Sequence, residues 1–301
     1  MKRVATLWIV LAVAAHGLAA SPTTLTDGRG RTVTLQQSPQ RVVSLAPSTT
    51  EIVYALGAGE RLVGRTRFCD FPPEVSEVPV IGAIQGTRPE ALLTHRPDLV
   101  LVSDLTPPSE IERMERLRLQ VLVLNHHGLD GIFQDIELAG RALGRTEAAQ
   151  SLNAQLQSTR DQVRQRLAGI APEEYPRVLL TFGPLEIYAP GGGTYPDRLL
   201  REAGGRNIAA NASSPWPKLS LEAILEADPQ VIFVSVDPDD HPELDSTALL
   251  QRYRAHDAWK RIDAVQQGKV YRLDADRLNR PGPRAISLLP EVAERLHPPG
   301  D

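Results

Sequence analysis

Cysteine and lysine are scarce in this 301-residue chain, which has one cysteine, Cys69, and four lysines among its 33 basic residues. A single cysteine excludes an intramolecular disulfide and a zinc site built from several thiolates. The net charge of −4 excludes nucleic-acid binding through bulk positive charge. Arginine supplies the other basic residues and suits contacts with anions, although a bias in genome composition explains its excess equally well.

Long apolar runs are scarce too, and the one near the N-terminus, residues 4–15, is too short to span a membrane. It follows Lys2 and Arg3 and precedes small residues, which is the pattern of a secretory signal peptide. We therefore predict a signal peptide over residues 1–20. Because no cysteine follows the apolar run, we expect no lipid attachment, and we expect the mature protein to be soluble and periplasmic.

The rest of the chain alternates apolar strand patterns with helical patterns, which predicts an α/β fold with parallel sheets. A short β arm within residues 22–39 comes first, and a helix is predicted from a capping box at residues 48–51 to Gly57. The predicted buried strands lie at residues 41–45, 62–64, 98–102, 121–124, 177–181, 231–234 and 270–273. The other predicted short helices lie at residues 90–95, 109–119, 195–203 and 221–227.

One long helix is predicted over residues 146–168, because Leu152, Leu156, Val163 and Leu167 fall on one stripe. It divides the chain into two α/β lobes joined by a single helix. The predicted division is an N-terminal lobe at 21–145, a linking helix at 146–170 and a C-terminal lobe at 171–301.

An internal repeat supports two equivalent lobes. Residues 89–103 align without gaps onto residues 221–235 at a constant offset of 132, and six positions are identical. The alternative is that helix–proline–strand units look alike in any α/β protein. The repeat pairs Glu90 with Glu222, each in the first turn of a short helix. Each acid either stabilises its helix dipole, or the pair forms a docking pattern for a two-fold symmetric basic partner.

The common enzyme motifs are absent from the sequence. The glycine run at 191–194 lacks the lysine of a phosphate-binding loop, and we interpret it as a flexible loop before a helix. His126 and His127 follow a strand end, where ligands bind in open α/β sheets, but a surface role explains them as well. The scattered histidines do not assemble into a metal site, so we predict no bound metal and no cofactor.

Aromatic residues number only 14, and three of them lie in loops between elements: Phe68, Tyr188 and Trp216. Such rings suit stacking on a large flat ligand, although each could instead plug its loop onto its own lobe. After the last strand, Arg277, Arg280 and Arg284 lie near Asp274 and Asp276. These arginines either meet anionic groups of a ligand or form a solvated charged loop.

Four segments together resemble a known family. Residues 41–51, 69–73, 96–100 and 215–217 resemble the cobalamin-binding proteins of ABC importers, and more broadly the helical-backbone binding proteins for cobalamin, haem and ferric siderophores. The resemblance runs from about residue 40 to near the C-terminus. It implies two α/β lobes bridged by one long helix, with the ligand in the cleft and little closure of the lobes.

The resemblance also implies roles for single residues. Phe68, Tyr188 and Trp216 stand at positions of aromatic side chains in the cleft, and Asp274 opens a loop that contacts corrin side chains. Glu90 and Glu222 fall on the two acids that bind arginines of the membrane permease. Two further cleft tryptophans are replaced by Ile84 and Ser103, and Ala203 stands at a cysteine position of a missing disulfide. The extra arginines Arg65, Arg67 and Arg277 leave haem or an anionic siderophore open.

We therefore expect a monomeric binding protein that captures a corrinoid, contacts it through Arg277 and the cleft residues above, and delivers it to an ABC importer permease dimer. Haem would need an axial ligand, for which Tyr188 and His127 are the candidates. The remaining alternatives are a metal-ion binding protein that uses the histidines and an exported enzyme whose best feature is Cys69.

Overall fold

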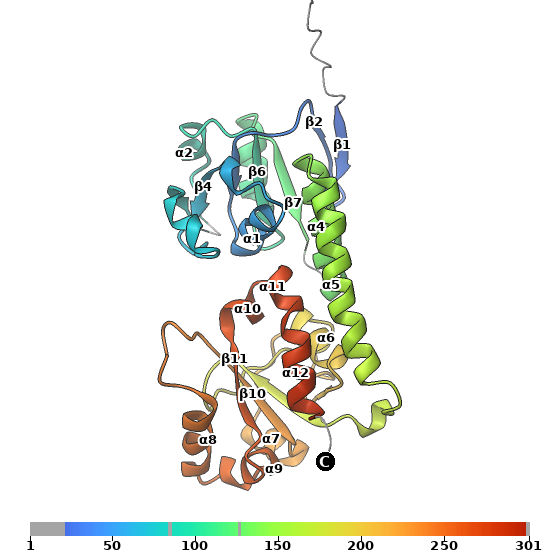
Figure 1. Cartoon of the computed structure of the whole chain (residues 1–301). Coiled ribbons are helices and arrows are strands. Elements are labelled where there is room, and N and C mark those ends of the chain that lie inside the picture. Colours follow the sequence, from blue (N-terminus) through green and yellow to red (C-terminus); the bar gives the residue numbers. More distant parts are fainter. Residues whose placement is uncertain (1–21, 84–85, 126–127, 299–301) are drawn as a thin grey trace, which may run out of the picture.

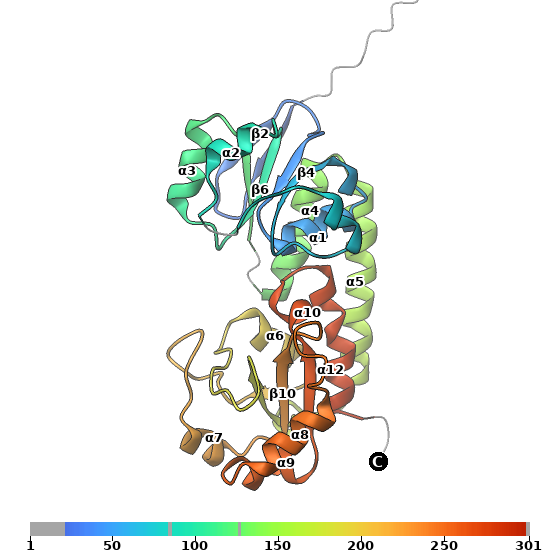
Figure 2. The same cartoon turned by 90° about the vertical axis from the view of Figure 1, so that its left-hand side faces the viewer.

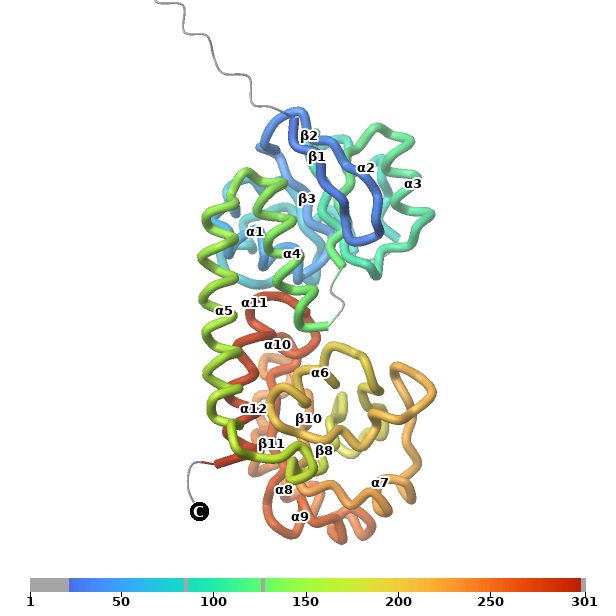
Figure 3. The backbone as a smooth tube through the Cα atoms, turned by 90° about the vertical axis from the view of Figure 1, so that its right-hand side faces the viewer, coloured from blue at the N-terminus to red at the C-terminus, as the bar shows by residue number. Residues whose placement is uncertain are grey.

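The computed structural model describes residues 22–83, 86–125 and 128–298. It has two α/β lobes, and the long helix α5 (Thr146–Arg166) runs beside both of them (Figures 1 and 3). The predicted signal peptide at 1–20 lies outside the described residues and stays a prediction. Among the helices of the described residues, none combines the length and the apolar character that crossing a bilayer requires.

The N-terminal lobe contains a five-stranded parallel sheet and an antiparallel hairpin that precedes it. The sheet order is β5-β4-β3-β6-β7. The strands are β1 (Thr23–Thr26), β2 (Thr32–Leu35), β3 (Val42–Ser44), β4 (Leu62–Thr66), β5 (Val80–Gly82), β6 (Leu99–Ser103) and β7 (Val121–Leu124). The helices are α1 (Pro47–Ala55), α2 (Pro89–Leu93), α3 (Pro108–Arg116) and α4 (Gly128–Ala142), with 3₁₀ turns at Gly59–Arg61 and Pro73–Glu77.

The C-terminal lobe contains a four-stranded parallel sheet in the order β11-β10-β8-β9. Its strands are β8 (Arg177–Thr181), β9 (Arg206–Asn207), β10 (Val231–Val236) and β11 (Val270–Asp274). Its helices are α6 (Tyr195–Glu202), α7 (Leu221–Ala227), α8 (Ser246–Ala255), α9 (Asp263–Gln266), α10 (Ala275–Asn279), α11 (Pro283–Ile286) and α12 (Leu288–Leu296), with 3₁₀ turns at Pro172–Glu174 and Trp259–Arg261. The predicted fold class of two α/β lobes with parallel sheets is confirmed.

The predicted repeat forms the same local structure in both lobes: α2 followed by β6, and α7 followed by β10. Between helix and strand, Arg96 (φ 46°) and Asp228 (φ 41°) both adopt the left-handed conformation, which non-glycine residues rarely adopt. The Nε groups of Arg41 and Arg177 donate to the carbonyl oxygens of these two residues, each at 3.1 Å. The repeat therefore extends to its backbone conformation and its hydrogen bonds, which favours duplication over chance similarity.

The two lobes share one apolar core along α5. Leu156 and Val163, from the predicted stripe, are buried in a cluster that continues from the N-terminal sheet to α12 and the C-terminal sheet. Helix α11 also packs against α1 across the junction (Figure 2). A continuous core of this kind opposes independent movement of the lobes, because separating them would expose apolar surface to water.

One prediction about a helix is wrong, and one helix was missed. The predicted capping box at residues 48–51 does not cap α1, because Pro47 occupies the first turn and Ala46 is the N-cap residue. The Thr49 and Thr50 hydroxyls instead donate back to the Ala46 carbonyl, and Glu51 contacts the other lobe. Helix α4 was not predicted, although the buried residues 129, 132, 136 and 139 have helical spacing.

Candidate ligand-binding cleft

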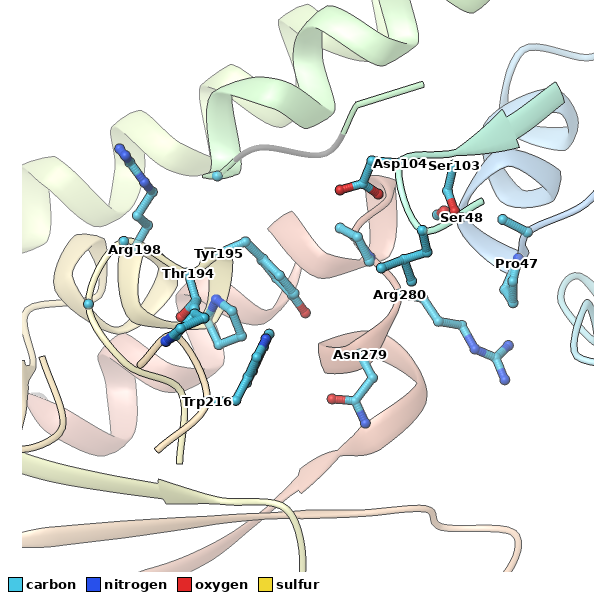
Figure 4. A pocket seen from close by; sticks show the side chains of 18 residues that line it. Pro47, Ser48, Ser103, Asp104, Thr194, Tyr195, Arg198, Trp216, Asn279 and Arg280 are labelled. Atoms are coloured by element: carbon cyan, nitrogen blue, oxygen red, sulfur yellow. The ribbon is translucent and has the colours of Figure 1, made fainter. Parts of the chain in front are cut away.

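A cavity of about 770 Å³ lies between the lobes (Figure 4). The N-terminal lobe contributes the segments that follow β3 and β6. The order of the sheet reverses between these two strands, and ligands of open α/β sheets bind at such a reversal. The C-terminal lobe contributes the start of α6, the loop around Trp216 and the segment 279–281. The lining residues are Ala46, Pro47, Ser48, Ser103, Asp104, Leu105, Gly128, Gly192, Gly193, Thr194, Tyr195, Pro196, Arg198, Pro215, Trp216, Asn279, Arg280 and Pro281.

Trp216 is an exposed ring on a well-braced loop. Half of its surface (52%) is exposed, although burial of an indole is strongly favourable. The ring lies 5.6 Å from Phe182, centroid to centroid. The backbone on either side is bonded to a neighbouring segment, because Gly191 N donates to Pro215 O at 2.9 Å and Ala189 N to Pro217 O at 3.1 Å. A rigid, exposed aromatic face at a cavity is suited to stacking on a flat ligand.

The glycine run at 191–194 supports this loop by close backbone packing. A Cβ on Gly191 would lie 2.4 Å from Ser214 O, and one on Gly192 would lie 2.1 Å from Ala210 O. Our interpretation of a flexible loop is therefore wrong, since these glycines allow two backbone segments to touch. Gly193 N donates to Asp197 at 3.0 Å, so it is engaged within the loop and not held open for a phosphate.

Leu105, which sequence reasoning missed, lines the cavity from the N-terminal lobe. It is 63% exposed, more than the other large apolar side chains that are exposed in the described residues. The sequence feature that could have identified it is its position two residues after the end of a buried strand, at the sheet edge where ligands bind. Leu105 and Trp216 therefore bring one exposed apolar side chain from each lobe to the same cavity.

The other predicted ligand residues do not line this cavity. Phe68 is 41% exposed and contacts the Arg67 guanidinium, and Tyr188 is 47% exposed beside Lys218. Asp274 caps α10 by accepting the Arg277 N–H at 3.1 Å. Asp274 thus has a local structural role, and ligand contact by Phe68, Tyr188, Asp274 and Arg277 stays a prediction.

The arginines after the last strand bind carboxylates of the protein. Arg277 donates to Glu291 at 3.0 Å. Arg284 donates two hydrogen bonds to Glu51, at 2.6 and 3.0 Å. Its guanidinium also lies over the Phe71 ring, with the Arg284 Cζ atom 3.8 Å from the ring centroid. These ion pairs differ from the solvated charged loop of one expectation, and ligand contact by the arginines stays a prediction.

Arg280 extends the same pattern. It contacts Asp70 at 2.7 Å and Asp276 at 2.5 Å. Glu51 and Asp70 belong to the N-terminal lobe, whereas both arginines belong to the C-terminal lobe. We call the pairs Glu51–Arg284 and Asp70–Arg280 the interlobe clasp. Its ion pairs fix the spacing of the lobes on the α1 side of the cavity.

Burial and pairing act in opposite directions on the clasp carboxyl groups. Burial raises the pKa of Glu51 even though Arg284 opposes the rise. At Asp70, burial also acts to raise the pKa, but the hydrogen bonds and charge of Arg280 outweigh it and lower the pKa. Arg284 therefore opposes the protonation of Glu51 that burial favours.

Arg160 of α5 ties the lobes together on the other side. It donates to Asp130 of α4 at 2.6 Å and binds Glu202 of α6 with two short contacts. Its side chain is 10% exposed. The linking helix therefore contributes a charged contact to each lobe as well as its apolar stripe.

The paired acids of the repeat lie far from the cavity. Glu90 in α2 and Glu222 in α7 are both exposed, and α2 and α7 lie at opposite ends of the molecule on the side away from α5 (Figure 3). Backbone hydrogen bonding and the charge of Arg113, 3.4 Å away, lower the pKa of Glu90. The two helices that carry these exposed acids therefore lie on the same side of the molecule.

The enzyme and metal-binding alternatives depend on Cys69 and on clusters of metal-binding side chains. Cys69 is fully buried, with its sulfur 3.2 Å from the Thr66 hydroxyl. Within residues 22–83, 86–125 and 128–298, no group of three or more His, Cys, Asp or Glu residues is arranged to hold a metal ion. Ile84, His126 and His127 lie outside the described residues.

Comparison with known proteins corrects our predicted localisation. The chain is 29% identical over 321 residues to an uncharacterized ABC transporter substrate-binding lipoprotein of Bacillus subtilis, an alignment that covers 99% of this chain and 98% of the relative. We expected a periplasmic protein without lipid because no cysteine follows the apolar run. A lipoprotein relative that aligns over the whole chain contradicts that localisation, and we withdraw it.

Two solved structures share the fold and are more than 25% identical over the aligned residues. The vitamin B12-binding protein of Vibrio cholerae has a TM-score of 0.73 and 29% identity, over 86% of this chain and 97% of that one. A haem-binding protein of Roseiflexus sp. RS-1 has a TM-score of 0.72 and 27% identity, over 86% and 98%. The family model described as "Periplasmic binding protein" matches residues 42–277. The chain therefore belongs to the periplasmic binding protein family, whose members are substrate-binding proteins of ABC transporters.

Proposed function

We propose that this protein binds a corrinoid of the cobalamin type in the interlobe cavity and delivers it to an ABC importer. The observation that carries the proposal is the braced, exposed Trp216 ring, which lines the same cavity as the exposed Leu105. The volume of about 770 Å³ is within the range of small-molecule sites, and a larger ligand would extend out of the cleft. The vitamin B12-binding relative is consistent with this ligand.

The pairing of the arginines that follow β11 favours a neutral, amide-bearing ligand over an anionic one. Arg280 lines the cavity, but two carboxylates already neutralise it. Arg277 and Arg284 are likewise paired with carboxylates. A ligand with free carboxylates would have to compete with these pairs, whereas amide groups need only hydrogen-bond partners.

Haem is the second candidate, and one feature favours it. Arg198 lines the cavity without an ion pair among the described residues, so it is available to a propionate or to an anionic siderophore. The two tyrosines considered as axial ligands of the haem iron are less well suited. Tyr188 is not in the cavity lining, and burial raises the pKa of Tyr195, which disfavours the phenolate that would bind ferric iron.

Delivery would require docking on the permease and would involve no catalysis by this chain. We propose that a monomer uses Glu90 and Glu222 to bind basic residues on the two halves of a permease dimer. Their exposure, their equivalence in the repeat and the position of α2 and α7 on one side of the molecule support this role. The shared core and the interlobe clasp imply that the lobes move little when the ligand binds.

The ligand is identified by titrating residues 21–301 with cyanocobalamin, haemin and a ferric siderophore, followed by tryptophan fluorescence and visible absorption. We expect saturable one-to-one binding of cyanocobalamin and weaker binding of the other two. A Soret shift with haemin and no response to cyanocobalamin would contradict the corrinoid ligand and keep the importer role. No response to any of the three would contradict the proposal as a whole.

A further inference from the structure

Tyr195, the first residue of α6, carries a hydroxyl whose purpose the protein itself does not explain. The ring lines the cavity and extends from α6 toward the segment that holds Asn279 (Figure 4). Its oxygen is shielded from solvent and has no hydrogen-bond partner among the described residues. A buried hydroxyl without a partner destabilises a protein, and phenylalanine would fill the same space without that cost.

The neighbouring carboxylate does not satisfy this hydroxyl. Glu51 lies close enough for its charge to add to the effect of burial, and together they raise the pKa of Tyr195. Both oxygens of Glu51, however, accept hydrogen bonds from Arg284. The phenol therefore stays protonated at neutral pH and keeps a donor that no described group accepts.

Ser103 of the N-terminal lobe also has a buried hydroxyl without a hydrogen-bond partner among the described residues. It ends β6, is 3% exposed and lines the same cavity. Each lobe thus has one unpartnered hydroxyl, shielded from solvent in the free protein, on a residue that lines the cavity. Unsatisfied buried polar groups in a binding cavity are accounted for when the bound molecule supplies their partners.

We propose that the Tyr195 hydroxyl is a ligand-binding group that donates a hydrogen bond to an acceptor oxygen on the edge of the bound ligand. The inference rests on the proposed function, because a corrinoid presents amide carbonyl oxygens around its ring. The ligand would stack on Trp216 while its edge reaches Tyr195, with small side-chain adjustments of the lining as the oxygen becomes accessible. Ser103 would bind the facing edge in the same way.

Tyr195→Phe separates this role from a structural one, because the two roles predict opposite signs. The substitution removes a donor that costs stability in the free protein, so the thermal midpoint of the free protein should rise or stay unchanged. The same substitution should weaken cyanocobalamin binding by about tenfold, the effect of one lost hydrogen bond in a buried site.

Tyr253→Phe is the matched control. The Tyr253 hydroxyl is buried away from the cavity and accepts a hydrogen bond from Leu185 N at 3.1 Å. Its loss leaves a backbone donor unpaired, so the thermal midpoint should fall while the affinity for cyanocobalamin stays unchanged. The two phenylalanine variants should therefore move stability and affinity in contrasting ways.

The experiment measures the thermal midpoint and the dissociation constant of cyanocobalamin for the unmodified protein and both variants. Unchanged affinity in Tyr195→Phe, or a fall of its midpoint like that of Tyr253→Phe, would overturn the inference while leaving the proposed function intact. If the unmodified protein binds haemin in place of cyanocobalamin, the proposed ligand is wrong. The inference is then tested by the ratio of the haemin dissociation constants of Tyr195→Phe and the unmodified protein, and a ratio of one would overturn it. Binding of neither ligand would overturn both.

Discussion

The two lobes are built on the same helix–strand unit, yet they bring different chemistry to the cavity between them. In both, an arginine donates to the carbonyl oxygen of the left-handed residue between helix and strand at 3.1 Å, and an exposed glutamate lies in the first turn of the helix. At the cavity, the C-terminal lobe provides Trp216 and Tyr195, whereas the N-terminal lobe provides Leu105 and Ser103. The duplicated unit thus keeps the scaffold and the outer surface alike, while the loops at the strand ends differ and define the ligand site.

The lobes also differ in charge where they meet. The N-terminal lobe supplies the carboxylates of the interlobe clasp and the C-terminal lobe supplies its arginines. This complementarity stabilises the observed packing of the lobes, because separating them would leave the buried Glu51 carboxylate without its arginine. The following predictions test the differences between the lobes.

The largest expected effect comes from breaking the clasp with Arg284→Gln. Glu51, whose side chain is 3% exposed, would lose its buried partner, and removal of one partner from such a pair costs about 3–5 kcal/mol. Urea unfolding at pH 7 measures the loss. The double variant Glu51→Gln/Arg284→Gln is the control and should regain most of the stability, because no charge is then left unpaired.

The pH dependence of the same variant gives a second test of the clasp. The pKa of Glu51 is raised above its ordinary value of 4.5, so folding favours the protonated form and the charged form opposes it. Stability should therefore fall as pH rises through the folded pKa of Glu51. Without Arg284 that pKa is higher still, so the deficit of Arg284→Gln should be greatest at neutral pH and shrink on acidification. A deficit that is independent of pH would contradict the pairing.

The next effect tests the unequal contributions of the lobes to the cavity. We expect Trp216→Ala to weaken cyanocobalamin binding by about 10- to 100-fold, since an aromatic ring and its stacking are lost. Leu105→Ala should weaken it by only about two- to fivefold, because less apolar area is removed. Leu93→Ala, an exposed apolar position outside the cavity, is the control and should leave affinity unchanged. Equal effects at Trp216 and Leu105 would contradict the asymmetry.

The smallest effects test the equivalence of the outer surfaces. Glu90→Gln and Glu222→Gln should each reduce ligand delivery to the permease about fivefold, as expected for one exposed ion pair. The effects should be equal and should multiply in the double variant, while ligand affinity stays unchanged. Uptake by the importer in proteoliposomes measures this. An effect at only one position would mean that the lobes dock differently, despite the repeat.

The sequence predicted the parallel strands, the long helix and the repeat because each depends on a local pattern. Buried parallel strands are continuous apolar runs, and the β7 and β8 boundaries are as predicted. The start of α1 was misjudged because Ser48–Glu51 has the letters of a capping box while Pro47 already begins the helix. The capping box and the proline predict different first residues for the helix, and α1 begins at the proline.

The candidate site was predictable only where a residue's own neighbours reveal it. Trp216 between two prolines was such a case. The carboxylate partners of the arginines were not predictable from neighbouring residues. Asp70 is 210 residues from Arg280 in the chain, and Glu51 is 233 residues from Arg284. Tyr195 was noticed only as a helix start, since no sequence pattern reports an unpartnered hydroxyl. Such features depend on packing between lobes.

The central claim is that the cavity between these unequal lobes binds one corrinoid through Trp216. Isothermal titration of cyanocobalamin into the unmodified protein and into Trp216→Ala tests it most directly. The account predicts a stoichiometry of one and a dissociation constant that rises at least tenfold in the variant. Absence of binding to the unmodified protein, or equal affinity in the two proteins, would contradict it.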